Sequence, residues 1–432
     1  MTESQGLHHA LDEAPLSRTQ LLGILLCLLL NALDGFDVLA ISFASPGIAA
    51  EWGIDRAALG LVLSMELIGM AVGSVVLGAY ADRAGRRPAI LSCLVLMAIG
   101  MLAATFAGDV ETLSAFRLVT GLGIGGMLAC TNAMVAELAN ARTRSIAVGL
   151  MASGYPVGAI VGGSVAATLL AGGEWRHVFL FGAGMTALFL PIAWWLMPES
   201  IRYLIQRQPA GALDRVNSLL SRMGRPPLDA LPPVGESSSK LPLAQLFAAP
   251  LARTTILLTI AYFCHIMTFY FILKWLPKIV VDMGYPASQA AGVLVWANVG
   301  GLLGAVLLSV LSWRVPLRSL LVVALIAATA MVTLFGQGAH DLAGLAWIAG
   351  IAGFCTNAGV VGMYALIAQS FPTHARGSGT GFVIGVGRGG AALGPILAGI
   401  LFSLNLQLQG VAAAMAIGSL IASLALLGLK RA

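Results

Sequence analysis

The stretch "GAYADRAGRRPAI", residues 78–90, places four charged side chains between two long apolar runs. The runs on either side cover about 58–80 and 89–107. A helix needs about 20 apolar residues, at a rise of about 1.5 Å each, to cross a bilayer. The pattern therefore predicts a pair of membrane-spanning helices joined by a short charged loop at one face.

The rest of the chain repeats this pattern. It has 432 residues, 58% of them hydrophobic, with a mean hydropathy of +0.91 and 10% charged residues. Soluble domains carry about 25% charged residues, so this composition excludes an ordinary soluble protein. We predict twelve spans, at 20–45, 58–80, 89–107, 112–137, 145–170, 176–198, 254–281, 288–311, 317–336, 342–369, 377–401 and 407–429.

Basic residues predict the orientation of these spans. Of the 24 Lys and Arg residues, eighteen fall on the face that carries both termini and the central loop. Cytoplasmic loops carry an excess of Lys and Arg, so we expect this face to be cytoplasmic. The net charge of +5 then reflects topology, and no nucleic-acid partner is expected because the basic residues are scattered over many loops.

The chain also contains an internal repeat. Two segments that begin at Ala136 and Ala368 align at an offset of 232, which matches Arg144 with Arg376 and Gly158 with Gly390. We predict an all-α membrane protein of twelve transmembrane helices in two six-helix pseudo-repeats. Its predicted parts are an N-terminal bundle (1–198), a cytoplasmic central loop with one amphipathic helix (199–253) and a C-terminal bundle (254–432).

The charged loop resembles a motif of the major facilitator superfamily, G-x-x-x-D-R-x-G-R-R, and the resemblance extends over essentially the whole chain. It implies a gating role for the matching residues, where a plain topogenic loop is the alternative. The gating candidates are Gly78, Asp82, Arg83, Gly85, Arg86, Arg87, Glu137 and Arg144. Glu137 has a second interpretation, a salt bridge to the loop between spans four and five.

Span four opens with "FRLVTGLGIGG", which is similar to the R-x-x-x-G-x-G pattern of the same superfamily. Its glycines are not a dinucleotide loop, because no strand precedes them, and small residues allow helices to approach closely. Arg117 in this stretch either reaches the membrane surface or faces a central cavity.

Span one contains "LDGFD", residues 33–37. It resembles the D-G-x-D motif of the aromatic acid:proton symporter family within the superfamily. Positions three apart share a helix face, so Asp34 and Asp37 point the same way. Two adjacent carboxylates do not both ionise cheaply, which suits proton coupling, although neutralisation by a structural arginine is the alternative. Glu66 and His265 are further coupling candidates, and a purely structural histidine is an open interpretation.

Several other polar or aromatic residues within spans are candidates for binding substrate. Arg388 is the first choice for a substrate carboxylate, because guanidinium binds carboxylate in a bidentate manner. Lys274 either pairs with a substrate carboxylate or with an acid of the bundle. The remaining candidates are Arg117, Tyr155, Tyr270, Trp275, Asn298 and Asn357, for which helix bridging or packing is the alternative.

The resemblance implies a proton-coupled symporter in a bacterial inner membrane, importing a small organic anion such as a hydroxybenzoate-type acid. A symporter of non-aromatic acids (a dicarboxylate or sugar acid) and a sensor with a transporter fold are the alternatives. No phosphate-binding loop, catalytic triad, metal cluster or CxxC pair occurs in the sequence, so we expect no enzyme activity and no cofactor. Protons, lipid and the organic acid are the expected partners, and the family implies a monomer.

Overall fold

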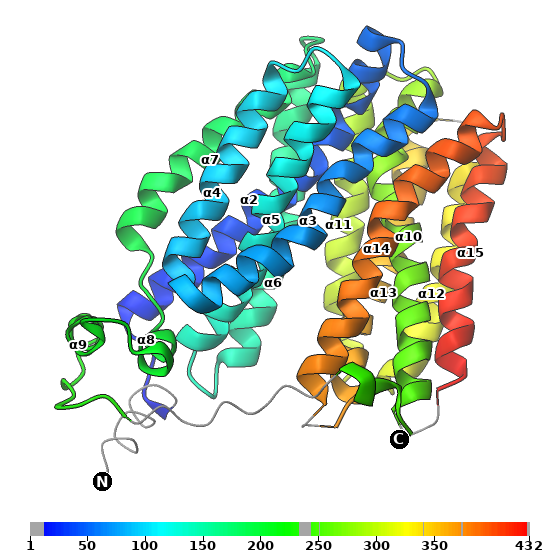
Figure 1. Cartoon of the computed structure of the whole chain (residues 1–432). Helices are drawn as coiled ribbons and strands as arrows, with labels where there is room; N and C mark the ends of the chain where they lie inside the picture. The colour runs from blue at the N-terminus through cyan, green and yellow to red at the C-terminus, as the bar shows by residue number, and fades with distance from the viewer. Residues whose placement is uncertain (1–12, 233–242, 250, 340, 373–374, 430–432) are drawn as a thin grey trace.

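The computed structural model describes residues 13–232, 243–249, 251–339, 341–372 and 375–429. These residues form helices and no strand, and twelve of the helices are long and apolar enough to cross a membrane (Figure 1). The predicted fold class is thereby confirmed. The twelve are α2 (Arg18–Trp52), α3 (Arg56–Ala84), α4 (Arg86–Thr105), α5 (Val110–Leu138), α6 (Arg144–Leu170), α7 (Arg176–Leu196), α10 (Ala252–Asp282), α11 (Ala287–Leu311), α12 (Leu317–Gly336), α13 (Leu342–Ser370), α14 (Arg376–Ser403) and α15 (Leu408–Leu427).

Polar side chains at the helix ends explain several of these bounds. Ser17 forms a capping box with Gln20 at the start of α2, and Asp55, Asp109 and Asp341 each accept a backbone N–H at the start of α3, α5 and α13. The first span is longer than predicted. It continues past residue 45, through a proline, and ends where Gly53 adopts a left-handed conformation at φ 59°.

The central segment holds more structure than the one amphipathic helix that we predicted. That helix is α9 (Ala212–Arg222), and it is preceded by the short α8 (Ile201–Arg207) and followed by the 3-10 turn η2 (Leu243–Phe247). The apolar face of α9 packs against α8 through Val216 and Leu219. Lys240, Lys430 and Arg431, three of the eighteen basic residues, lie outside the described residues.

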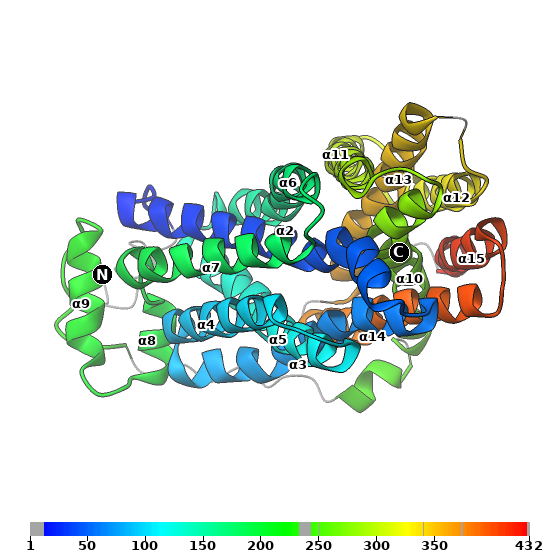
Figure 2. The same cartoon turned by 90° about the horizontal axis from the view of Figure 1, so that it is seen from above.

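The spans are arranged as two groups, which we call the first half (α2–α7) and the second half (α10–α15). We call the end where α2 begins and α15 ends the terminal face, and the other end the opposite face. The halves meet through α2 with α10, α3 with α14, and α6 with α11. Figures 1 and 2 show the two groups side by side, with their helices close together at the opposite face and diverging toward the terminal face. The division into domains at residues 198 and 253 stays a prediction.

Candidate functional site

A cluster of buried charged groups lies between the two halves. Glu66 on α3 places one carboxylate oxygen, Oε2, 2.6 Å from the guanidinium of Arg117 on α5 and 3.2 Å from Nζ of Lys274 on α10. All three side chains are 0% exposed. Because Glu66 and Arg117 belong to the first half and Lys274 to the second, the cluster joins the halves.

Two consecutive backbone carbonyl groups of α2 accept hydrogen bonds from the two cations. Arg117 donates to the carbonyl oxygen of Asp37 at 2.8 Å, and Lys274 donates to that of Val38. Buried charges are tolerated when they are paired and hydrogen-bonded in this way. The second carboxylate oxygen of Glu66, Oε1, and the Nε of Arg117 have no hydrogen-bond partner among the described residues.

The glycines of "FRLVTGLGIGG" determine where Arg117 lies. A Cβ atom added at Gly121 would lie 2.1 Å from the carbonyl oxygen of Glu66, and one added at Gly125 would lie 2.1 Å from that of Met70. The backbones of α3 and α5 therefore touch at these points, which small residues alone permit. This contact brings Arg117, one turn before Gly121, next to Glu66. Arg117 is therefore buried against Glu66 and does not reach the surface, and its predicted role in binding substrate stays a prediction.

Asp34 and Asp37 lie beside this cluster on α2 and are 1% and 0% exposed. Oδ2 of Asp37 accepts a hydrogen bond from the hydroxyl of Thr186 at 3.4 Å, whereas neither oxygen of Asp34 has a donor among the described residues. Gly35 between them lets α6 approach, because a Cβ there would lie 2.0 Å from the carbonyl oxygen of Tyr155. The D-G-x-D pattern thus provides two buried acids, and its glycine permits the close contact between α2 and α6.

The cluster contains more acids than bases. Asp34, Asp37 and Glu66 supply three carboxyl groups, against two cations from Arg117 and Lys274, and all five residues are at most 1% exposed. Uncompensated charge in a low-dielectric interior is costly. The arrangement is neutral when one of the three carboxyl groups carries a proton.

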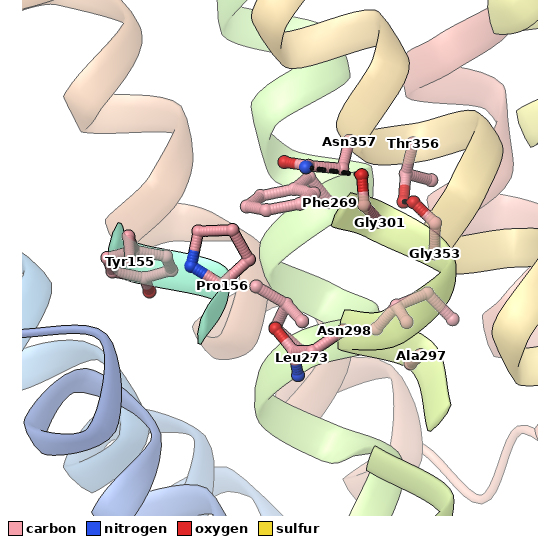
Figure 3. A pocket seen from close by; sticks show the side chains of 11 residues that line it. Tyr155, Pro156, Phe269, Leu273, Ala297, Asn298, Gly301, Gly353, Thr356 and Asn357 are labelled. Atoms are coloured by element: carbon pink, nitrogen blue, oxygen red, sulfur yellow. Dashed lines mark hydrogen bonds between the residues drawn. The ribbon is translucent and has the colours of Figure 1, made fainter. Parts of the chain in front are cut away.

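A small cavity lies beside the cluster. It encloses about 20 Å³, room for about one water molecule, and its lining includes Tyr155, Phe269, Leu273, Asn298 and Asn357 (Figure 3). Two of the predicted substrate-binding residues, both asparagines, here hydrogen-bond backbone carbonyls: Asn298 that of Leu294 at 2.9 Å and Asn357 that of Gly301 at 2.8 Å.

The other predicted binding residues lie outside the lining of this cavity. Tyr270 packs edge-on against Phe269 at 5.3 Å between ring centroids. Trp275 donates to the carbonyl oxygen of Pro395 at 3.1 Å. Arg388 donates to the carbonyl oxygen of Met70 at 3.0 Å, which makes a second contact between the halves.

His265 makes two hydrogen bonds that hold three helices of the second half together. Its Nε2 lies 2.8 Å from the carbonyl oxygen of Thr356 on α13, and its Nδ1 lies 2.9 Å from the hydroxyl of Ser419 on α15. A carbonyl oxygen only accepts, so Nε2 carries the hydrogen and Nδ1 accepts from the serine. The predicted role of His265 in proton coupling stays a prediction, and this geometry fits a structural role.

The predicted gating residues gather at the terminal face. Arg86 pairs with Asp82 at 2.7 Å and with Glu137 at 3.1 Å, so the partner of Glu137 is this arginine. Gly85 has a φ of 109°, which suits glycine at the tight turn between α3 and α4. Gly78 has space around it, with the nearest atom 3.8 Å from a Cβ placed there, and Arg144 begins α6.

Sequence reasoning missed three residues of this cluster. The Glu199 carboxylate accepts the backbone N–H groups of Arg86 and Arg87 at 2.9 and 3.2 Å, and so caps α4 from another part of the chain. Burial raises the pKa of Glu199, although these N–H groups oppose the shift. The Tyr203 hydroxyl donates to the carbonyl oxygen of Arg83, and Arg207 donates to that of Asp82. The only sequence signal was an acid directly after Pro198 at the end of a span.

Comparisons with known proteins agree with this architecture. The family model for the Major Facilitator Superfamily matches residues 27–343 and 258–432. The chain is 32% identical to a gallate transporter of Pseudomonas putida, covering 96% of this chain and 93% of that protein. It is 31% identical to a 4-hydroxybenzoate transporter of Pseudomonas aeruginosa, covering 96% and 94%.

The fold also matches solved structures. A crystal structure of a D-xylose-proton symporter superposes with a TM-score of 0.71 at 18% identity, covering 94% of this chain and 95% of that one. At this identity the match concerns the fold alone. The chain is thus a multi-pass transporter of the Major Facilitator Superfamily and belongs, within it, to the aromatic acid:proton symporter family.

Proposed function

We propose that this protein is a symporter that imports an aromatic carboxylate, such as a hydroxybenzoate-type acid, together with protons. The observation that carries the proposal is the buried cluster between the halves, where Asp34, Asp37 and Glu66 face Arg117 and Lys274. The cations can bind the carboxylate of a substrate, and the surplus acid can carry a proton. The relatives named for gallate and 4-hydroxybenzoate support the aromatic class.

The orientation is part of the proposal. The basic residues of the terminal face place it in the cytoplasm of a bacterial cell, with the protein in the inner membrane and acting as a monomer. In that orientation the structure is closed toward the outside. The halves are joined at that side by Arg56 with Asp282 and deeper in the membrane by Glu66 with Lys274, and the Asp82–Arg86–Glu137 cluster lies on the cytoplasmic side.

In the proposed cycle, the acids of the cluster take up a proton from the outside and the substrate carboxylate binds a cation, Arg388 or Arg117. Aromatic side chains, Tyr155 among them, contact the ring. The two halves then rock about the site, and the charge cluster at the terminal face breaks and re-forms with each change of state.

Uptake into proteoliposomes tests this function. Labelled benzoate, 4-hydroxybenzoate, succinate and gluconate would be offered with and without an inward proton gradient, and then with a protonophore. Accumulation of an aromatic acid that the protonophore abolishes is the expected result. Gradient-driven accumulation of a non-aromatic acid alone would overturn the substrate class, and aromatic uptake indifferent to the gradient would overturn proton coupling.

A further inference from the structure

We infer that Glu66 occupies the binding position of the transported carboxylate, and that the substrate displaces it from Arg117 and Lys274 as one proton enters the cluster of acids. This inference rests on the proposed function, since it specifies how that site binds an organic anion. It assigns the anion site to a pair of cations contributed by both halves, where sequence reasoning placed Arg388 first.

The geometry of the two cations is that of a carboxylate-binding site. They converge on one oxygen, Oε2 of Glu66, from α5 and from α10. Both cations are completely buried, so no surface charge competes with the carboxylate. The site also has unused capacity, because the Nε of Arg117 has no acceptor among the described residues. An incoming carboxylate therefore has this N–H donor of Arg117 available in addition to the two ion pairs.

The surrounding charges require that a proton accompany the anion. The acids facing Glu66 are Asp34 and Asp37 on α2, and the phenols of Tyr155 on α6 and Tyr270 on α10 are further titratable neighbours. Arg388 on α14 donates to the carbonyl oxygen of Met70, one turn from Glu66, but it is half-buried and lies outside the five fully buried groups that are counted here. With one proton shared among the three acids, the cluster is neutral. An added anion would leave it with a charge of −1, and a second proton restores neutrality.

The carboxylate of Glu66 loses both cations when the substrate binds them, because it alone of the three acids pairs with both. Its two ion pairs break, the substrate carboxylate forms two in their place, and the three acids share the incoming proton. One proton and one anion enter, so the charge of the site does not change.

The position of the site links anion binding to the motion of the halves. Lys274 reaches Glu66 from the second half, and the adjacent Leu273 lines the 20 Å³ cavity, which is far too small for an aromatic acid. Substrate entry therefore needs the halves to separate at this level, and this separation pulls Lys274 away from Glu66. The site forms again when Lys274 and Arg117 close on the substrate carboxylate.

Proton counting by isothermal titration calorimetry tests the inference. Purified full-length protein would be titrated with benzoate, 4-hydroxybenzoate, succinate and gluconate in two buffers of different ionisation enthalpy. We expect the wild type to take up about one proton per bound anion, and Glu66→Gln to bind the same anion at least about tenfold more tightly, because no carboxylate then competes for the two cations. An affinity of Glu66→Gln equal to or below that of the wild type would overturn the inference, as would the absence of carboxylate binding in both proteins.

Variants of the lysine complete the test. Lys274→Met should weaken anion binding by about tenfold to a hundredfold, the usual effect of losing a charged hydrogen bond. Lys278→Met is the matched control, because Lys278 lies one turn away on α10 and pairs with Asp282 of the same helix. If Lys274→Met does not fold, the double variant Glu66→Gln/Lys274→Met replaces it and should bind more weakly than Glu66→Gln alone.

Wild-type affinity in the Lys274 variant would overturn the inference. Binding of a non-aromatic acid with the expected proton count, and of no aromatic acid, would overturn the proposed substrate class and leave the anion site standing. The two proposals therefore fail by different results.

Discussion

Arg56 at the start of α3 lies 3.1 Å from the carboxylate of Asp282 at the end of α10, and so joins the two halves at the opposite face. The same two helices carry Glu66 and Lys274 deeper in the membrane. One connection between the halves is therefore solvent-accessible and the other is buried. The two pairs should differ in their contribution to stability.

Arg56→Met should lower the free energy of unfolding by at most about 1 kcal/mol, because the Arg56 and Asp282 side chains are 44% and 32% exposed and surface pairs contribute little. Lys274→Met removes one partner of a buried pair and should cost about 3–5 kcal/mol. Unfolding in detergent, followed by intrinsic fluorescence, compares the two. Equal losses would contradict the expected difference between the exposed pair and the buried pair.

Replacing both acids of span one should uncouple transport from the proton gradient. In Asp34→Asn/Asp37→Asn the cluster retains one acid against two cations, so no proton is needed when an anion enters. A gradient of two pH units drives about a hundredfold accumulation at one proton per anion, and this should fall toward one. Counterflow exchange of labelled for unlabelled substrate checks that the variant is folded. Wild-type accumulation would show that both aspartates are structural.

Gly158→Ala should destabilise the protein by about 1–3 kcal/mol, because its Cβ would lie 1.7 Å from the carbonyl oxygen of Ala32 on α2. Gly149→Ala on the same helix is the matched control, since no atom lies within 4 Å of a Cβ there. Alanine favours a helix over glycine by about 1 kcal/mol, so the control should be neutral or slightly stabilised. Thermal unfolding of both variants measures the difference, and similar midpoints would refute this account of the α2–α6 contact.

Glu199 should give stability a specific pH dependence. Burial raises the pKa of its carboxyl above the ordinary value of 4.5, so the folded chain binds this proton more tightly than the unfolded chain does. The stabilisation from this group is complete below 4.5 and is lost as the pH rises through the raised value. The melting temperature of the wild type minus that of Glu199→Gln should therefore fall over this pH window. Parallel pH profiles would contradict the prediction.

His265→Gln should affect stability more than coupling. The histidine bonds to Thr356 and Ser419, and loss of either bond in a buried site costs about 1–3 kcal/mol. Gradient-driven uptake per folded molecule should remain within about twofold of wild type, a difference below about 0.5 kcal/mol. A variant that binds substrate but no longer responds to the gradient would place His265 among the coupling residues.

Hydrophobicity and charge predicted the twelve spans, because membrane helices must be long and apolar whatever they contact. The same reasoning marked Asp34, Glu66, Arg117 and Lys274 as unusual, since buried charges are costly. It did not predict that Glu66 pairs with both cations, because that pairing depends on the contact of α3 with α5 at Gly121 and on how the halves dock.

The hydrogen-bond partners of several polar residues were also not predictable, because these partners depend on how distant segments pack. Glu199 follows a span directly, and nothing nearby in the sequence indicates that it caps a helix 113 residues earlier. Similarly, Asn298 and Asn357 line the small cavity, but the sequence does not indicate that each also donates to a backbone carbonyl. Sequence identifies a buried polar group more readily than it identifies the group's partner.

The numbers of acids and bases in the central cluster also bear on the energy source for uptake. In the proposed exchange, one proton enters with one monovalent anion, so a complete cycle moves no net charge across the membrane. The membrane voltage then does no work on the carrier, and only the difference in pH drives accumulation. Depolarising the vesicles with potassium and valinomycin should leave uptake unchanged. Cells with a large voltage but no pH difference would gain nothing from this protein.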